Sequence, residues 1–182
     1  MSLPHILLGL IKYKPNTGYN IKTAFQNSIH FFWDVSLPQI YRTLNSMEDK
    51  GWLESAIEPQ EGKPNKKRYR ISAEGEKQFH EWLECGPVDM PSKDELLVKL
   101  FFGQFMDRDV LAAHIKKRRA QAGQFLEAAE SEIAPSVEDY ARRAGRKQDM
   151  AFWLLTLEFG RRRARMTQEW CDHALEVLEK QP

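Results

Sequence analysis

The chain has 182 residues, of which 27 are Lys or Arg and 26 are Asp or Glu, giving a formal net charge of +1. This length is enough for one large or two small domains, and the balanced charge excludes any argument from bulk electrostatics for a nucleic-acid or membrane partner. The apolar run "ILLGLI" (6–11) is too short to span a membrane and lacks a signal peptide's cleavage pattern. Cys85 and Cys171 belong to no metal-spaced cluster, so we expect reduced thiols. We therefore expect a cytoplasmic protein with no membrane partner.

The first half of the chain predicts helices before any strand. Residues 2–13 read as a short apolar helix, and the segment "YKPNTG" (13–18) reads as the turn that closes it. A second helix is predicted from about Gly18 to Ile29, and "HFFWDV" (30–35) connects it to a third.

The third helix, predicted from Ser36 to Lys50, carries its charges against the helix dipole. Ser36 and Gln39 form an S-x-x-Q capping box, Gly51 follows the end, and the buried stripe is Ile40, Leu44 and Met47. A helix favours acids in its first turn and cations in its last. Here the acids Glu48 and Asp49 come at the far end, and the earlier polar residues are Gln39, Arg42, Thr43, Asn45 and Ser46.

A hairpin and a fourth helix are predicted next. Alternating residues over 53–58 and 68–71 indicate two strands, and the turn between them, "PQEGKPNKK" (59–67), is rich in lysine. A helix then starts near Ser72 and packs through Phe79 and Trp82. The order helix, helix, helix, hairpin, helix is that of a winged helix-turn-helix.

The second half is predicted to be helical. We place a winged helix-turn-helix domain at 1–85, a Gly/Pro-containing linker at 86–93, and a helical dimerisation domain at 94–182. After a short apolar helix (94–105), Asp107 caps a long helix that is expected to stop at Pro135. A second capping box, "SVED" (136–139), opens a short segment, and the last helix runs over 147–179.

Two apolar stripes follow the last helix. The first is expected to form the dimerisation seam in a coiled-coil manner, and its residues are Met150, Leu154, Leu157, Ala164, Cys171, Leu175 and Leu178. The second consists of Phe152, Phe159 and Met166. A helix that is apolar on two sides needs two neighbours; we expect one to be the 107–134 helix of the same chain and the other a second subunit.

The third helix has the composition of one that docks on DNA. An acid-free amino-terminal end suits phosphate, and Gln, Arg and Asn are side chains that read bases. A lysine-tipped hairpin beside it reaches the flanking backbone. The predicted DNA-binding residues are Ser36, Gln39, Arg42, Asn45, Lys63, Lys66, Lys67 and Arg68. The alternatives are an exposed helix that lacks acids by chance and wing lysines that only solubilise.

Several segments together resemble the PadR family of bacterial transcriptional regulators over nearly the whole chain. They are "ILLGLI" (6–11), "GYNIKTAF" (18–25), "FFWDVSLPQIYRTLNSMEDKGWLE" (31–54), "QEGKPNKKRYRISAEGEKQFHEWL" (60–83), "DELLVKLFFG" (94–103) and "EWCDHALEVL" (169–178). The resemblance implies a mostly α protein, with an amino-terminal winged helix-turn-helix and a carboxy-terminal helical dimerisation domain. It also implies a homodimer on a palindromic operator, and repression more often than activation. By the same resemblance Tyr41 is a DNA-binding residue, the alternative being a half-buried tyrosine next to the apolar stripe.

Some members of that family respond to aromatic molecules, so a small aromatic effector is a possible partner. The residues considered for its pocket are Trp33, Phe101, Phe105 and Trp153, although aromatics at helical spacing are commonly core. No metal spacing, phosphate loop or nucleophile motif is present, so we expect no enzyme, no metal and no cofactor. The alternative function is a protein-interaction or small-molecule-sensing module with little or no DNA binding.

Overall fold

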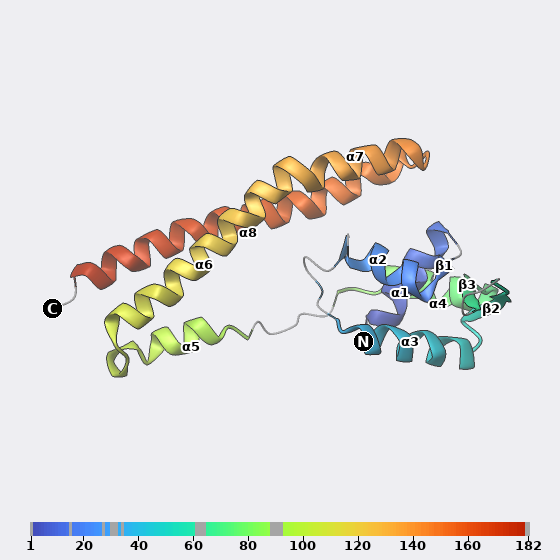
Figure 1. The fold of residues 1–182 in the computed structure, drawn as a ribbon, viewed down its shortest axis with the longest axis horizontal. Helices are drawn as coiled ribbons and strands as arrows, with labels where there is room; N and C mark the ends of the chain where they lie inside the picture. The colour runs from blue at the N-terminus through green and yellow to red at the C-terminus, as the bar shows by residue number, and fades with distance from the viewer. Residues whose placement is uncertain are drawn as a thin grey trace. The chain divides into compact units, whose positions relative to one another are not determined.

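The computed structural model describes residues 2–14, 16–26, 28–29, 33, 35–60, 65–87 and 93–180. The chain divides into two compact units, residues 1–89 and 90–182, and the division falls within the segment predicted as the linker. Figure 1 labels the elements of each unit. The protein is mostly α-helical, with one small antiparallel sheet in the first unit.

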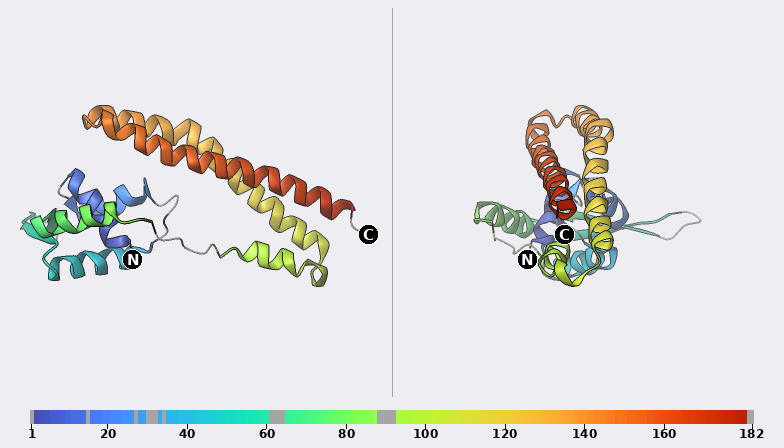
Figure 2. Two further views of the ribbon diagram at one scale, coloured as in Figure 1. Left: turned by 180° about the vertical axis from the view of Figure 1, so that it is seen from behind. Right: turned by 90° about the vertical axis from the view of Figure 1, so that its left-hand side faces the viewer.

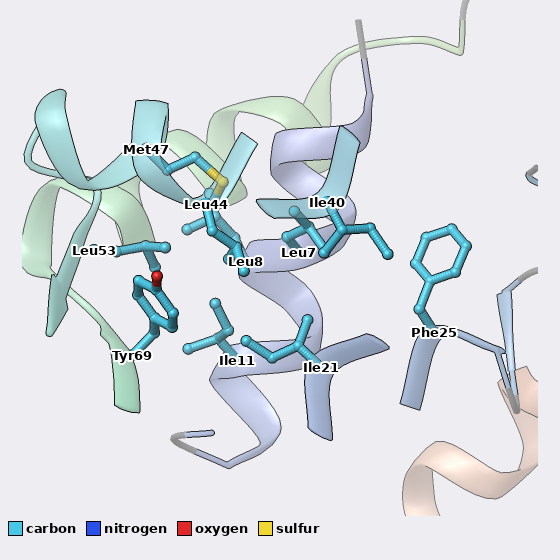
Figure 3. Packing of buried hydrophobic residues seen from close by; sticks show 10 residues of the cluster. All are labelled: Leu7, Leu8, Ile11, Ile21, Phe25, Ile40, Leu44, Met47, Leu53 and Tyr69. Carbon is cyan, nitrogen blue, oxygen red and sulfur yellow. The ribbon is translucent and has the colours of Figure 1, made fainter. Parts of the chain in front are cut away.

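The first unit has the element order of a winged helix-turn-helix. Its elements are α1 (Leu3–Tyr13), β1 (Asn16–Thr17), α2 (Gly18–Gln26), α3 (Leu37–Asp49), β2 (Leu53–Glu58), β3 (Lys66–Ile71) and α4 (Ala73–Glu84). Its buried core takes residues from α1, α2, α3, β2 and β3, and the partly buried Phe79 of α4 packs against it. Figure 3 shows the core: Leu7, Leu8, Ile11, Ile21, Phe25, Ile40, Leu44, Met47, Leu53 and Tyr69.

The ends of α3 follow the local signals in the sequence. Pro38 lies in the first turn, where its missing N–H costs no helical hydrogen bond. Gly51 has a φ of 72°, and its N–H donates to the Glu48 carbonyl at 2.9 Å. Only glycine adopts this left-handed conformation readily, so Gly51 turns the chain directly from α3 into β2.

The sheet has the order β1-β3-β2, and both pairings are antiparallel. The register of the hairpin pairs Leu53 with Ile71 and Glu58 with Lys66. The sequence does not predict β1, because Asn16 and Thr17 lie in a segment with the composition of a turn and two residues are too few to show a period. The pairing of β1 with β3 brings the start of α2 beside the hairpin of β2 and β3, which is the wing of the fold.

The second unit consists of helices. Its elements are α5 (Glu95–Phe101), η2 (Gly103–Phe105), α6 (Arg108–Ala128), the π-helical η3 (Ala129–Ile133), α7 (Ala134–Arg143) and α8 (Lys147–Lys180). Asp107 caps α6 as predicted and accepts from the Val110 N–H at 3.0 Å. Helix α8 contacts both α6 and α7 along its length, as Figure 2 shows.

The prediction that Pro135 stops the long helix is wrong. The chain continues from α6 through one π-helical turn into α7, where Pro135 takes a first-turn position, and "SVED" lies inside α7 instead of capping it. Proline removes one helical hydrogen bond and crowds the carbonyl four residues before it. A widened π turn is one way to accommodate such a break. Arg161 of α8 donates to the Ala129 carbonyl at 2.9 Å, so a carbonyl at the start of this turn has a hydrogen-bond donor from α8.

Candidate nucleic-acid interface

The amino-terminal end of α3 is preorganised by its own side chains. The Gln39 Oε1 accepts from the Ser36 backbone N–H at 3.0 Å and from the Ser36 hydroxyl at 2.9 Å. The predicted capping box therefore forms, and both residues are exposed beside the unpaired N–H groups of the first turn. Because its oxygen is used for capping, Gln39 keeps its amide N–H groups as donors for a ligand.

The outward side of α3 carries polar side chains without an acid until Glu48. Arg42 and Asn45 are exposed, while Ile40, Leu44 and Met47 are buried in the core. The Arg42 Nε donates to the Pro38 carbonyl one turn earlier, at 3.4 Å. This contact holds the guanidinium along the amino-terminal half of the helix, where base edges are met in helix-turn-helix proteins.

Tyr41 is half-exposed, and its ring lies against the start of α2. A Cβ atom at Gly18 would stand 2.5 Å from a ring carbon of Tyr41, so the ring occupies the space that any other residue at position 18 would fill. Together with Lys66, Lys67 and Tyr69 of β3, Tyr41 lines an open hollow of roughly 360 Å³. Its remaining lining residues are Thr17, Gly18, Tyr19 and Asn20.

Glu48, which sequence reasoning did not place in the site, joins α3 to the wing. Its carboxylate accepts from the Lys67 ammonium at 2.5 Å and from the Ser55 hydroxyl at 2.5 Å. These hydrogen bonds, from Lys67 first and Ser55 second, lower the pKa of Glu48, and the same contact raises the pKa of Lys67. An acid that opposes the helix dipole was the signal in the sequence for this role.

The other described wing cations differ in their surroundings. Arg68 and Arg70 alternate with the buried Tyr69, so they lie on the face of β3 away from the core. Arg68 forms a two-pronged ion pair with Glu58, with N–O distances of 2.6 and 3.0 Å. Lys66 is exposed and has no ion pair within the described residues. Lys63, also predicted to bind DNA, lies outside the described residues.

The stripe predicted as the dimerisation seam packs mainly within one chain. Leu157, Ala164 and Cys171 are at most 8% exposed, and Leu175 and Leu178 pack on the cluster around Leu111 and Ile115. Met150 and Leu154 are partly buried in the part of α8 that contacts α7. The stripe therefore meets α6 and α7. The large apolar residues of α8 left exposed are Phe152, Leu155, Phe159, Met166 and, near its end, Val177.

The four residues considered for an aromatic pocket do not converge within their units. Trp33 packs against the core of the first unit. Phe101 and Phe105 of α5 and η2 are 83% and 78% exposed. The Trp153 ring lies 5.7 Å from that of Tyr140 of α7, at the opposite end of the helical unit from α5. No group of three potential metal ligands occurs among the described residues, and no described helix has the length and apolarity needed to cross a membrane.

The chain is similar to known regulators in sequence and in structure. It is 37% identical over 83 residues to the probable transcriptional regulator Rv1176c of Mycobacterium tuberculosis, a match that spans 46% of this chain and 44% of that protein. It is 29% identical over 124 residues to the negative transcriptional regulator PadR of Bacillus subtilis, which spans 65% of this chain and 68% of PadR.

The solved structures of two such proteins have the same fold. PadR of Bacillus subtilis in complex with operator DNA superposes with a TM-score of 0.78 at 23% identity, covering 98% of this chain and 99% of that chain. The structure of PadR in complex with p-coumaric acid superposes with a TM-score of 0.72 at 20% identity, covering 99% of this chain and 100% of that chain. The structure of the virulence activator AphA of Vibrio cholerae superposes with a TM-score of 0.76 at 25% identity, covering 98% of each chain.

The first unit, with its exposed α3 beside the hairpin, defines a winged helix-turn-helix protein. Residues 7–81 match the model of the transcriptional regulator PadR-like family, and residues 92–179 match that of the virulence activator alpha C-terminal region. The chain belongs to the PadR-like family of transcriptional regulators.

Proposed function

We propose that this regulator is a repressor that binds a palindromic operator as a homodimer. The observation that carries the proposal is the outward side of α3, where Gln39, Arg42 and Asn45 are exposed and no acid precedes Glu48. Such side chains hydrogen-bond to base edges in the major groove. The adjacent Lys66 supplies a cation for the flanking backbone.

The homodimer is proposed to form through the apolar face of α8 that its own chain leaves open. Leu155 and Phe159 are each 66% exposed, and Phe152 and Met166 extend the same kind of surface. Exposed apolar patches of this kind mark interaction sites. A two-fold dimer presents two copies of α3, and operator palindromy mirrors that symmetry with half-sites about one helical turn apart.

Repression, and release by a small aromatic molecule, are proposed from the relatives. PadR of Bacillus subtilis is described as a negative regulator and has been solved with p-coumaric acid. In this chain, Phe101, Phe105 and Trp153 are aromatic side chains that an effector could contact once the dimer forms. Tryptophan fluorescence titrated with a panel of phenolic and planar aromatic compounds tests this part, and an unchanged signal across the panel contradicts it.

A second candidate function is a protein-interaction module with little DNA binding. The observation that favours it is the pairing of wing cations with acids, since Lys67 and Arg68 each contact a glutamate. On this reading the exposed Phe101 and Phe105 serve a partner protein instead of the dimer.

Selection of short genomic duplexes with the purified full-length protein separates the two. The proposed function predicts enrichment of an inverted repeat whose half-sites are about one helical turn apart, and loss of that enrichment in Arg42→Ala. If no sequence is enriched and Arg42→Ala behaves as the parent does, the interaction module becomes the better account.

A further inference from the structure

Glu48 is an unfavourable residue for its place in α3. It lies in the last turn, where the helix carbonyls carry partial negative charge and an acid is destabilising. It is also the first acid on the outward side of a helix proposed to approach phosphates.

The carboxylate fixes one ammonium group. Its oxygens hold the Lys67 Nζ and the Ser55 hydroxyl, each at 2.5 Å, so a single side chain of α3 contacts both β2 and β3. The Lys67 Nζ also lies 5.4 Å from the centroid of the Tyr69 ring. Lys67 is therefore held in one position, whereas an ordinary surface lysine is free to move among many rotamers.

Lys67 also lines the hollow beside Tyr41. Lys67 and Tyr69 lie on the core-facing side of β3, and both line the hollow with Tyr19 and Tyr41. Tyr41 and Glu48 are about two turns apart on α3 and so point to the same side. An ammonium has three N–H donors, so Lys67 can keep Glu48 and still donate to an anion in the hollow.

We propose that this hollow binds one phosphate of the DNA backbone, and that Glu48 is the positioning residue that holds the Lys67 ammonium in place for it. The proposal rests on the proposed function and adds the site on the protein that takes the phosphate. Lys67 donates a charge-assisted hydrogen bond, and the hydroxyls of Tyr41 and Tyr19 are further donors from the same lining. The acid at the end of α3 then serves the interface through the lysine that it orients.

The far face of the wing offers a matched control. Arg70 pairs with Glu54 at 2.5 Å, so the same chemistry joins β3 to β2 there. This pair does not line the hollow. Variants of Arg70 and Glu54 thus change the same charges and the same strands without touching the proposed phosphate site.

The test compares full-length Lys67→Ala, Glu48→Ala, Glu48→Gln and the double Lys67→Ala/Glu48→Ala with Arg70→Ala and Glu54→Ala. Affinity is measured across a salt series for the selected duplex and for an unrelated one, with circular dichroism as the check of folding. Lys67→Ala is expected to weaken binding to both duplexes about tenfold and to lower the salt slope by about 0.9, because one phosphate contact is lost without a change in base reading. The Arg70 and Glu54 variants should keep the slope of the parent.

Glu48 gives the decisive comparison. Glu48→Ala is expected to weaken binding, Glu48→Gln to retain most of it because its amide oxygen still accepts from Lys67, and the double variant to bind no more weakly than Lys67→Ala. Tighter binding by Glu48→Ala, or a double-variant loss equal to the product of the single losses, would overturn the positioning role. A parent that binds DNA while Lys67→Ala binds equally well overturns the phosphate site alone. A parent that binds neither duplex overturns the proposed function, and this inference with it.

Discussion

The ring of Tyr41 lies where a side chain at position 18 would be, since a Cβ atom on Gly18 would approach a Tyr41 ring carbon to 2.5 Å. The start of α2 therefore depends on a glycine to leave room for the Tyr41 ring of α3. We predict that Gly18→Ala displaces Tyr41 and weakens operator binding about tenfold, the equivalent of one hydrogen bond to a charged phosphate.

Fluorescence anisotropy with the selected duplex checks this prediction. In a Tyr41→Ala background the added methyl group should cost no further affinity, because the ring that it displaces is gone. Gly86→Ala is the control, since nothing lies within 4 Å of a Cβ built there. Equal affinities for Gly18→Ala and the parent would show that the position of Tyr41 is irrelevant to binding.

The wing cations are predicted to contribute unequally to the salt dependence of DNA binding. Lys66→Ala should lower the slope by about 0.9, the value for one phosphate contact. The charge-balanced double variant Arg68→Ala/Glu58→Ala should change it by less than half as much, since Arg68 is already neutralised by Glu58. The salt slopes are measured from binding isotherms at several salt concentrations. A larger change of slope in the double variant would mean that Arg68 leaves Glu58 in the complex.

Substitutions at two nearby leucines of α8 are predicted to have different effects, one on dimerisation and the other on stability. Leu155 is 66% exposed, so Leu155→Asp should leave the fold intact and yield monomers in sedimentation equilibrium. Leu157 is 7% exposed within one chain, so Leu157→Ala should cost about 3 kcal/mol of unfolding free energy, as expected for a buried leucine. Phe159→Asp repeats the first experiment at a second exposed position. If Leu155→Asp and Phe159→Asp stay dimeric, the open face of α8 is not the dimer interface.

Protonation of Asp94 is predicted to make the helical unit less stable at acid pH. It caps α5 through the Leu96 and Leu97 N–H groups and pairs with both terminal nitrogens of Arg118. The Arg118 hydrogen bond, more than the backbone N–H groups, lowers the pKa of Asp94. A carboxyl with a lowered pKa in the folded state binds fewer protons than in the unfolded state, so its contribution is present at neutral pH and is lost as pH falls through the folded value.

Asp94→Asn isolates this charge because asparagine also caps helices. Urea unfolding should give Asp94→Asn an unfolding free energy about 1 kcal/mol below that of the parent at pH 7. This difference in unfolding free energy should shrink as the pH approaches 3. A difference that is independent of pH would assign the effect to packing.

Local signals were enough to predict much of the first unit. The capping box of Ser36 and Gln39, the buried stripe of α3 and the glycine stop at Gly51 each depend on residues a few positions apart. The exposed side of α3 follows from that stripe, because 3.6-residue periodicity fixes which residues face outward. This is why Arg42 and Asn45 could be assigned to the surface from the sequence.

The remaining features depend on contacts between distant segments. Periodicity shows that α8 has two apolar stripes, but it does not show which stripe meets α6 of the same chain. The contact of Glu48 with Lys67 depends on how β3 is aligned beside α3, and the pairing of β1 with β3 joins segments about fifty residues apart. The continuation through Pro135 needs a π turn, for which the sequence carries no local signal.

The most direct test of the central claim, that the outward side of α3 reads DNA, is the equilibrium affinity of Arg42→Ala for the selected duplex at moderate salt. We predict a loss of tenfold or more together with a weaker preference over an unrelated duplex, since a base contact is worth about 1–3 kcal/mol of discrimination. Unchanged affinity and unchanged preference in a folded, dimeric variant would contradict the account.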